Sequence, residues 1–185
     1  MDADLRVVPT GDWNPDDPDS FGRVYDEHFG RIYNYIRYRV RDAAVADDLA
    51  SLTFHKALDR RFTFDPTRAA VGTWLVVIAR NTICDHLRSQ RRRRALLLGL
   101  RRRDGFAAPD PESILIEAQE RGRLLAAIAE LPDRDRDLLG LKFAAGLSHR
   151  VIGEMTGQSE SNVGVLAHRA LVRLRVLLEI ERKGR

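Results

Sequence analysis

The side chains best suited to an anionic partner lie on one face of a predicted helix from Trp74 to Arg88. At about 100° per residue, this segment separates into an apolar row and a polar row. The apolar row is Val71, Trp74, Leu75, Ile78 and Thr82. The opposite row contains Arg80, Asn81 and Arg88, which are long, multivalent donors of the kind that bind phosphates and base edges. A solvated surface helix is the competing interpretation.

A second set of polar residues belongs to a predicted helix-turn-helix over residues 147–174. Ser148 is the expected N-cap of its first helix, Thr156-Gly157 supplies the sharp turn, and Ser159 caps the second helix. Gly153 falls where the two helices should cross, a position that needs a very small residue. An αα-hairpin without a role in DNA binding is the alternative. The outward residues are of types that reach into a major groove: Ser161, Asn162, His168, Arg169 and Arg173.

The charge of the chain is uneven. Its 185 residues carry a net charge of +4, but residues 1–20 hold six Asp and one Arg, a balance of −5 that leaves +9 for the remainder. Almost all the basic residues are arginines, which favour bidentate contacts with phosphates and bases. A basic body of this kind indicates a polyanionic partner or an acidic protein surface.

Several classes of protein are excluded by simple patterns. One cysteine rules out an internal disulfide, and Cys84 on the polar row is read as a small apolar residue rather than a redox sensor. The longest strongly apolar run, residues 95–100, is too short to span a bilayer, and the acidic N-terminus is no signal peptide. We therefore expect a soluble, cytoplasmic protein.

Catalysis is not expected either. The chain has no Gly-rich phosphate loop, no zinc-ligand pair and no nucleophile elbow. Asp47 and Asp48 are adjacent, so on a helix they point about 100° apart and make a poor acid/base or metal-binding pair. The five histidines are scattered along the chain. The sequence predicts no enzyme, no metal and no cofactor.

The elements that must position the polar residues are helices. Residues 1–20 are rich in Asp, Pro and Gly and are predicted to form a disordered acidic tail. From Phe21 to Val40, apolar residues recur three and four apart. Tyr33, Tyr35 and Tyr38 in this helix cannot all face inward, so some should lie at an interface. No stretch alternates with period two between turn residues, so strands are not expected.

Two further helices complete the first half. Asp42 should cap a helix that runs to about Arg60, and Phe64-Asp65-Pro66 predicts a turn because Pro66 cannot continue a helix. The helix that carries the first polar row should follow, from about Ala70 to Ser89. The inward residues expected in the capped helix are Leu49, Ala50, Thr53, Ala57 and Leu58.

A second domain should follow a flexible basic linker. Residues 88–103 contain eight Arg and no acid, and residues 104–111 have a linker's composition. The next helix begins near Glu112 and ends at Pro132. Asp133 should cap a helix that stops at Gly146. The residues that this last helix should bury are Leu138, Leu139, Leu141 and Phe143.

These motifs together resemble those of RNA polymerase sigma factors of the extracytoplasmic-function type, over residues 21–90 and 112–178. The family pattern of an acid followed by Asp-Leu-x-x-x-Thr-Phe appears at 47–54, and Phe-Asp-Pro at 64–66. Trp-Leu-x-x-Ile-Ala-Arg-Asn-x-x-x-Asp-x-x-Arg is complete at 74–88. Shorter matches are Leu-Pro at 131–132, Leu-Ser at 147–148 and His-Arg-Ala at 168–170. Four motifs in the family's order and spacing make the resemblance specific.

The resemblance implies an all-α chain of two small helical domains joined by a flexible basic linker. Residues 21–91 would form sigma domain 2, which binds the core polymerase and recognises and melts the −10 element. Residues 92–111 would be the linker, and residues 112–180 would form sigma domain 4, whose helix-turn-helix recognises the −35 element. The implied function is that of an alternative sigma factor, and a stand-alone helix-turn-helix regulator is the competing hypothesis.

The resemblance also assigns roles to residues. Contact with the clamp helices of the polymerase β′ subunit is implied for Asp47, Asp48, Leu49, Thr53 and Phe54. Binding of the −10 element is implied for Phe64, Arg68, Arg80, Asn81 and Arg88. Recognition of the −35 element is implied for the helix at 160–174, with Ser161, Asn162, His168, Arg169 and Arg173 outward. Further implied partners are the β flap of the polymerase, promoter DNA and an anti-sigma factor.

The chain departs from the family pattern at five positions, one of which is Val151, where the family often has Glu. Ser51 and Leu52 stand where the family has Gln and an acid, beside the clamp motif. Gly164 and Leu166 stand where basic residues are common early in the recognition helix. Readout of the −35 element then rests on the remaining outward residues or is weak, and the sequence leaves both possibilities open.

Overall fold

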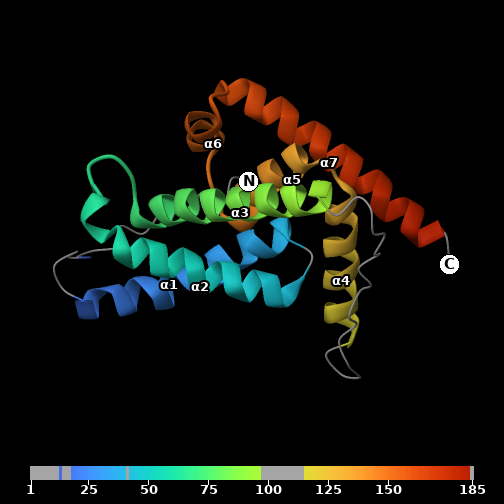
Figure 1. Cartoon of the computed structure of the whole chain (residues 1–185). Coiled ribbons are helices and arrows are strands. Elements are labelled where there is room, and N and C mark those ends of the chain that lie inside the picture. Colours follow the sequence, from blue (N-terminus) through green and yellow to red (C-terminus); the bar gives the residue numbers. More distant parts are fainter. Residues whose placement is uncertain (1–12, 14–17, 41, 97–114, 184–185) are drawn as a thin grey trace.

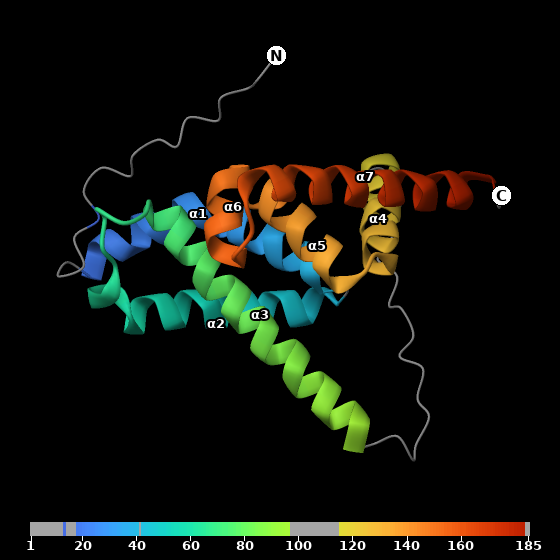
Figure 2. The same ribbon diagram turned by 90° about the horizontal axis from the view of Figure 1, so that it is seen from above.

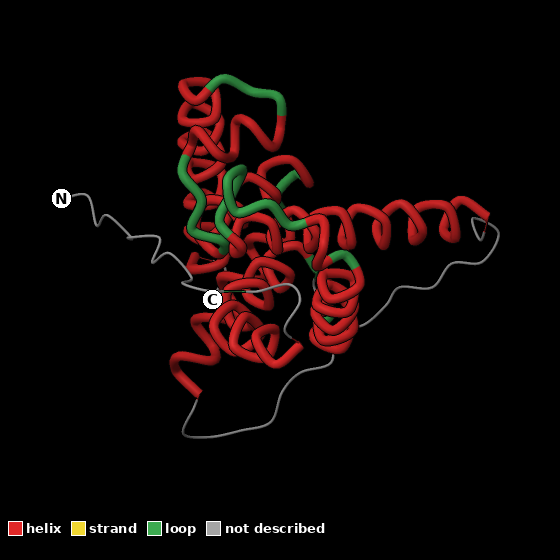
Figure 3. The backbone as a smooth tube through the Cα atoms, turned by 90° about the vertical axis from the view of Figure 1, so that its left-hand side faces the viewer, coloured by secondary structure: helices red, strands yellow, loops and turns green. Residues whose placement is uncertain are grey.

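The computed structural model describes Trp13 and residues 18–40, 42–96 and 115–183, and within these ranges every regular element is a helix (Figures 1 and 3). The elements are α1 (Pro18–Arg39), α2 (Ala43–Asp59), η1 (Arg61–Thr63), α3 (Val71–Leu96), α4 (Leu115–Glu130), α5 (Asp133–Leu139), η2 (Gly140–Ala144), α6 (His149–Thr156) and α7 (Glu160–Lys183). The predicted all-α class is confirmed. None of these helices is long and apolar enough to cross a membrane. Most of the predicted tail, and the predicted linker beyond Leu96, lie outside the described residues.

Helices α1, α2 and α3 pack around one apolar core (Figure 2). Asp42 caps α2 as predicted, since its carboxylate accepts a hydrogen bond from the Val45 backbone amide at 3.2 Å. The prediction for Leu58 was wrong: Ala57 takes the inward position, and Leu58, about 100° further around the helix, is exposed. The largest buried residues of this core include Ile32, Tyr35, Ile36, Leu75 and Ile83.

Helix α3 is longer than the sequence predicted. Its apolar row is inside, as expected, but the helix continues to Leu96 instead of ending near Ser89. Arginine is a good helix former, so the run of arginines from Arg91 to Arg94 prolongs the helix. Residues 92–96, assigned to the linker, are therefore helical, and α1 likewise begins at Pro18 within the predicted tail.

Two predictions for the second half were wrong. Asp133 does not cap α5: Pro132 occupies the cap position, and the Asp133 carboxylate instead accepts hydrogen bonds from Arg91 and Arg136. Phe143 is 53% exposed rather than buried. The segment η2 is a π-helical turn, whose wider spacing changes the phase of the side chains and turns Phe143 to solvent.

The helix-turn-helix forms as predicted from α6 and α7. The Ser148 hydroxyl accepts from the Val151 amide at 3.3 Å, and the Ser159 hydroxyl accepts from the Asn162 amide at 3.2 Å. Gly157 ends α6 with a φ of 68°, a left-handed conformation that glycine adopts at little cost. The Ser148 and Ser159 caps and this turn fix the start of α7 relative to α6.

The two halves of the chain share one apolar core. Leu138, Leu141 and Ile152 of the second half belong to the same buried cluster as Ile32 and Ile36 of the first. A smaller cluster joins α4, α5 and α7. Helix α5 and the turn η2 lie against α1, and α7 runs along the outer side, where it packs on α5 and α6 (Figures 1 and 2). The two predicted domains therefore stand in a fixed relation to each other in this structure.

We expect Gly153→Ala to destabilise the protein by about 1–3 kcal/mol, the usual cost of overpacking. A Cβ at this position would lie 2.6 Å from the Gln158 carbonyl oxygen, which is backbone and cannot rotate away. Gly164→Ala is the matched control: its Cβ would meet only His149 at 3.6 Å, so the gain in helix propensity should stabilise by up to about 1 kcal/mol. Urea denaturation of both variants measures the difference, and equal stabilities would contradict the close approach.

Candidate nucleic-acid interface

The polar row of α3 is only partly open to solvent. Asn81 and Arg88 are exposed, and Arg88 forms an ion pair with Asp85 at 3.1 Å on the same face. Arg80 is partly buried, because its Nε donates at 2.9 Å to the Asp137 carboxylate of α5. Of the three predicted α3 residues, two are therefore accessible and the third is engaged by the second half of the chain.

Asp137 accepts hydrogen bonds from two side chains of the first half and forms an ion pair with a third, Arg39, whose buried Nε makes no hydrogen bond. The Tyr35 hydroxyl donates to its Oδ1 at 2.8 Å, Arg39 Nε lies 3.3 Å from the same oxygen, and Arg80 donates to Oδ2. Arg39 also donates to the Asp133 backbone carbonyl at 2.8 Å. Burial, reinforced by the Asp137 charge, raises the pKa of Tyr35 well above its ordinary value. Burial by itself opposes the charge of Arg80, but Asp137 outweighs it and raises the pKa of the guanidinium.

The turn between α2 and α3 presents one exposed aromatic side chain and one packed one. Phe64 packs against Trp74 and Trp13, with ring centroids 5.5 Å and 4.7 Å apart. Phe62 is 64% exposed, with the Arg61 guanidinium 4.2 Å above its ring. The sequence analysis missed Phe62, which lies in the 3-10 turn η1 two residues before Phe64, where a rotation of about 120° per residue turns the two rings to different sides. Arg68 is exposed nearby.

A tight local hydrogen bond shapes the same turn. The Asp65 carboxylate accepts from the Thr67 amide at 2.9 Å and from the Thr67 hydroxyl at 2.7 Å. The hydroxyl and then the amide hydrogen bond favour the ionised acid and lower the pKa of Asp65. Asp65 therefore holds the turn that presents Phe62, Phe64 and Arg68.

Only part of the acidic motif on α2 is accessible. Asp47 and Asp48 are exposed, whereas Leu49, Thr53 and Phe54 are core residues. Thr53 uses its hydroxyl within the helix, donating to the Leu49 carbonyl at 2.6 Å. The buried residues hold the helix in place, and the surface beside the acids is completed by Leu52, 43% exposed, which the sequence analysis noted only as a departure from the family pattern.

The outward residues of α7 divide into two groups. Ser161, Asn162, His168 and Arg169 are all exposed at the surface of the helix-turn-helix. The Asn162 amide donates to the Gln158 side chain at 2.6 Å. Arg173 is different, because it forms an ion pair at 2.5 Å with Asp135, which is 6% exposed. Since a buried carboxylate needs a partner, Arg173 serves first to fix α5 against α7.

The described residues hold no group of three or more His, Cys, Asp and Glu side chains that could bind a metal ion. The exposed donors are arginine, asparagine, serine and histidine side chains on two helices, with an aromatic turn beside one of them. This arrangement suits phosphates, base edges and unstacked bases.

Comparison with known proteins agrees with this chemistry. Residues 24–93 match the family model for Sigma-70 region 2, and residues 121–174 match that for Sigma-70, region 4. RNA polymerase sigma factor CarQ of Myxococcus xanthus is 31% identical over 86% of this chain and 90% of its own length. The chain belongs to the sigma-70 family of RNA polymerase sigma factors, in its extracytoplasmic-function group.

Other relatives bear the same description. ECF RNA polymerase sigma factor BldN of Streptomyces coelicolor is 36% identical over 160 residues, and this chain spans 61% of its length. Among solved structures, the sigma factor RpoE in complex with the anti-sigma factor NepR from Bartonella quintana has a TM-score of 0.73 at 20% identity. That likeness covers 88% of this chain and 98% of the other, and it shows a shared fold.

Trp13→Ala should loosen the turn between α2 and α3. The Trp13 ring packs against Phe64, and its centroid lies 5.4 Å from that of the Trp74 ring, so its removal leaves a gap in the aromatic cluster. We expect a red-shifted emission from Trp74 and faster amide exchange in residues 61–70. Trp13→Phe, which keeps an aromatic ring there, should change both less. Unchanged Trp74 emission in Trp13→Ala would contradict this packing.

Proposed function

We propose that this sigma factor binds core RNA polymerase and directs initiation at a specific set of promoters. The observation that carries the proposal is the presence, on one chain of this family, of two separate donor-bearing helices and an acidic helix surface. The relatives' names, which are those of RNA polymerase sigma factors, support it. The proposed role of the protein is that of a non-catalytic initiation factor that acts in the cytoplasm.

Each domain has a proposed task. Residues 21–91, with α3 extending to Leu96, would bind the polymerase and the −10 element, and residues 112–180 would bind the −35 element. A melted base needs a stacking platform and a cationic track. The stacking platform would be the turn, with Phe62, Phe64 and Arg68. The cationic track would be the polar row of α3, with Arg80, Asn81 and Arg88.

The surface proposed to bind the polymerase is the exposed side of α2. Asp47 and Asp48 provide charge, and Leu52 provides an apolar centre beside them. Charged contacts around an apolar centre are typical of protein interfaces. We propose that this surface binds the clamp of the β′ subunit and that the second domain binds the β flap.

Readout of the −35 element is assigned to the exposed part of α7. Ser161, Asn162, His168 and Arg169 would face the major groove. Gly164 lies against His149 of α6, where a Cβ would be 3.6 Å from the ring, so it presents no side chain to DNA. Arg173 would act mainly through Asp135, by holding α7 in place.

An anti-sigma factor is a proposed partner. The solved structure of RpoE is a complex with the anti-sigma factor NepR, and that of CnrH is a complex with the cytosolic domain of CnrY. Exposed apolar side chains along α7 would give such a partner a surface. They are Val165, Leu171, Val172, Val176 and Ile180.

We expect Asp48→Arg to weaken binding to core polymerase by about tenfold or more, because it places a positive charge in a contact that uses negative charge. Asp48 is exposed, so the fold should be unaffected. Asp26→Arg, an equal change of charge at an exposed position on α1, is the control and should bind normally. Titration of labelled core enzyme measures both. Equal affinities of the two variants and wild type would contradict the role of α2.

Asn81→Ala should reduce formation of open complexes by about tenfold, while holoenzyme binding to a pre-melted promoter changes by less. The reason is that the amide contributes only once bases have left the stack. Asn81 is exposed, so its removal should not disturb the core. Permanganate footprinting and binding to a bubble template separate the two steps. A normal yield of open complex on a cognate promoter would show that this face does not hold the −10 strand.

A further inference from the structure

The three donors around Asp137 form a preorganised receptor for an anionic group. Tyr35 is completely buried and Arg39 is 6% exposed, so neither side chain is free to rotate away. Together with Arg80 they contact both oxygens of one carboxylate at 2.8 to 3.3 Å. A phosphodiester has the same negative charge and likewise offers two oxygens to such donors.

The acidic residues of α5 pair with basic residues along α3. Asp133 and Asp137 are one turn apart on α5, and they pair with Arg91 and Arg80, which lie three turns apart on α3. Arg39 from α1 and Arg136 from α5 bring the local total to four arginines against two aspartates. The site therefore keeps an excess of positive charge even when the acids are in place.

The second half of the chain is fitted closely around this receptor. Gly140 packs against Tyr35, where a Cβ would lie only 3.1 Å from the ring. On the other side of the contact, Arg31 donates to the Ala145 carbonyl at 2.5 Å, and its burial lowers the pKa of that arginine. These contacts seat the second domain on the receptor.

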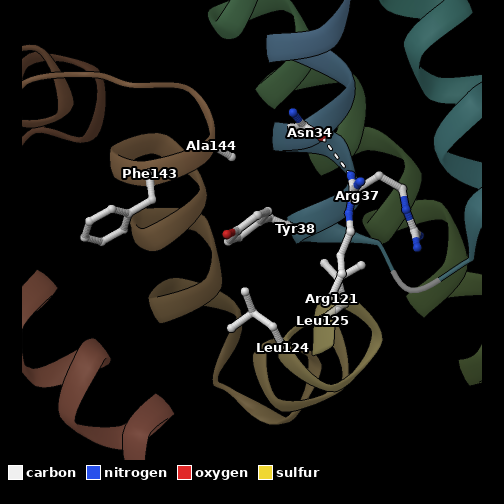
Figure 4. Close-up of a pocket in the computed structure, with 8 residues that line it drawn as sticks. All are labelled: Asn34, Arg37, Tyr38, Arg121, Leu124, Leu125, Phe143 and Ala144. Atoms are coloured by element: carbon white, nitrogen blue, oxygen red, sulfur yellow. Dashed lines mark hydrogen bonds between the residues drawn. The ribbon is translucent and has the colours of Figure 1, made fainter. Parts of the chain in front are cut away.

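The fit is incomplete at one edge. A pocket of about 280 Å³ lies between α1, α4 and η2, beside Tyr38 and Phe143 (Figure 4). Arg121 crosses this edge to donate to Asn34 at 3.2 Å. The two halves share an apolar core, but at this edge the seam is polar and partly hollow, and its polar groups find other partners when it opens.

We propose that Tyr35, Arg39 and Arg80 bind a backbone phosphate of the promoter strand, and that Asp137 occupies this receptor as an internal competitor when the two domains are packed together. The inference rests on the proposed function, and it adds a binding site. Tyr35 and Arg39 extend the track of Asn81 and Arg88 from α3 onto α1. The sigma factor alone then binds nucleic acid weakly, because its own carboxylate holds the site.

The test is binding of a fluorescent single-stranded oligonucleotide of arbitrary sequence to the full chain, without polymerase. Asp137→Asn should bind about tenfold more tightly than wild type, since a competing charge is removed and three donors become available. Asp26→Asn is the matched control: it removes one negative charge from an exposed position on α1, more than two turns from Tyr35. It should change affinity by no more than about twofold to threefold.

Further substitutions test whether the gain in affinity comes from the proposed phosphate-binding residues. In the Asp137→Asn background, Tyr35→Phe removes only the hydroxyl, and Arg39→Lys removes the planar donor; each should cancel most of the gain. Circular dichroism checks that each variant is folded.

Two results would overturn the proposal: no tighter binding by Asp137→Asn than by Asp26→Asn, or a gain that persists with Tyr35→Phe and Arg39→Lys. The proposed function is tested separately by transcription with wild-type protein and core enzyme. Promoter-specific transcription combined with no effect of Asp137→Asn would leave the sigma-factor function intact and reject the receptor.

Discussion

The pairing of Asp137 with Tyr35, Arg39 and Arg80 decides how the two halves of this molecule are arranged. A carboxylate removed from water must be matched by donors, and the three that match this one belong to the first domain. The apolar contacts around it, from Leu141 and Ile152, are not directional and would permit other placements. The ion pairs select one placement of the second half against the first. They contribute register more than net stability, because desolvating charged groups costs about as much as their attraction returns.

The contact between Asp137 and its three partners covers one polar surface of the molecule and leaves two others exposed. The acids of α2 and the polar residues of α7 remain exposed in the packed arrangement, whereas Arg80 is engaged by α5. A polymerase that binds α2 and the second domain at a fixed separation would pull Asp137 away from its donors. Docking to the polymerase would thereby expose the cationic track to which we propose that the promoter strand binds, and the free energy of polymerase binding would favour binding of the strand.

Local order around the turn between α2 and α3 has a simpler origin. Asp65 fixes the backbone through Thr67, and Phe64 is held by Trp74 and Trp13. Phe62 is left exposed on the other side of an otherwise rigid segment. A rigid exposed ring loses little conformational entropy when a base stacks on it, which is why such a turn suits an unstacked strand.

The sequence by itself determined where the helices lie, three of the four predicted caps and most of the residues that face the core. Asp42, Ser148, Ser159 and Gly157 act locally, through hydrogen bonds or backbone conformations within a few residues, so their roles can be read from the chain. The polar row of α3 was also readable, because a helical period repeats along the sequence, and the resemblance to the family rests on the order and spacing of its motifs. Phe143 was not, since a π-helical turn changes that period. Only the tertiary structure decided that Arg80 meets Asp137: the two residues are 57 positions apart, and a pairing between domains depends on geometry that no local pattern contains.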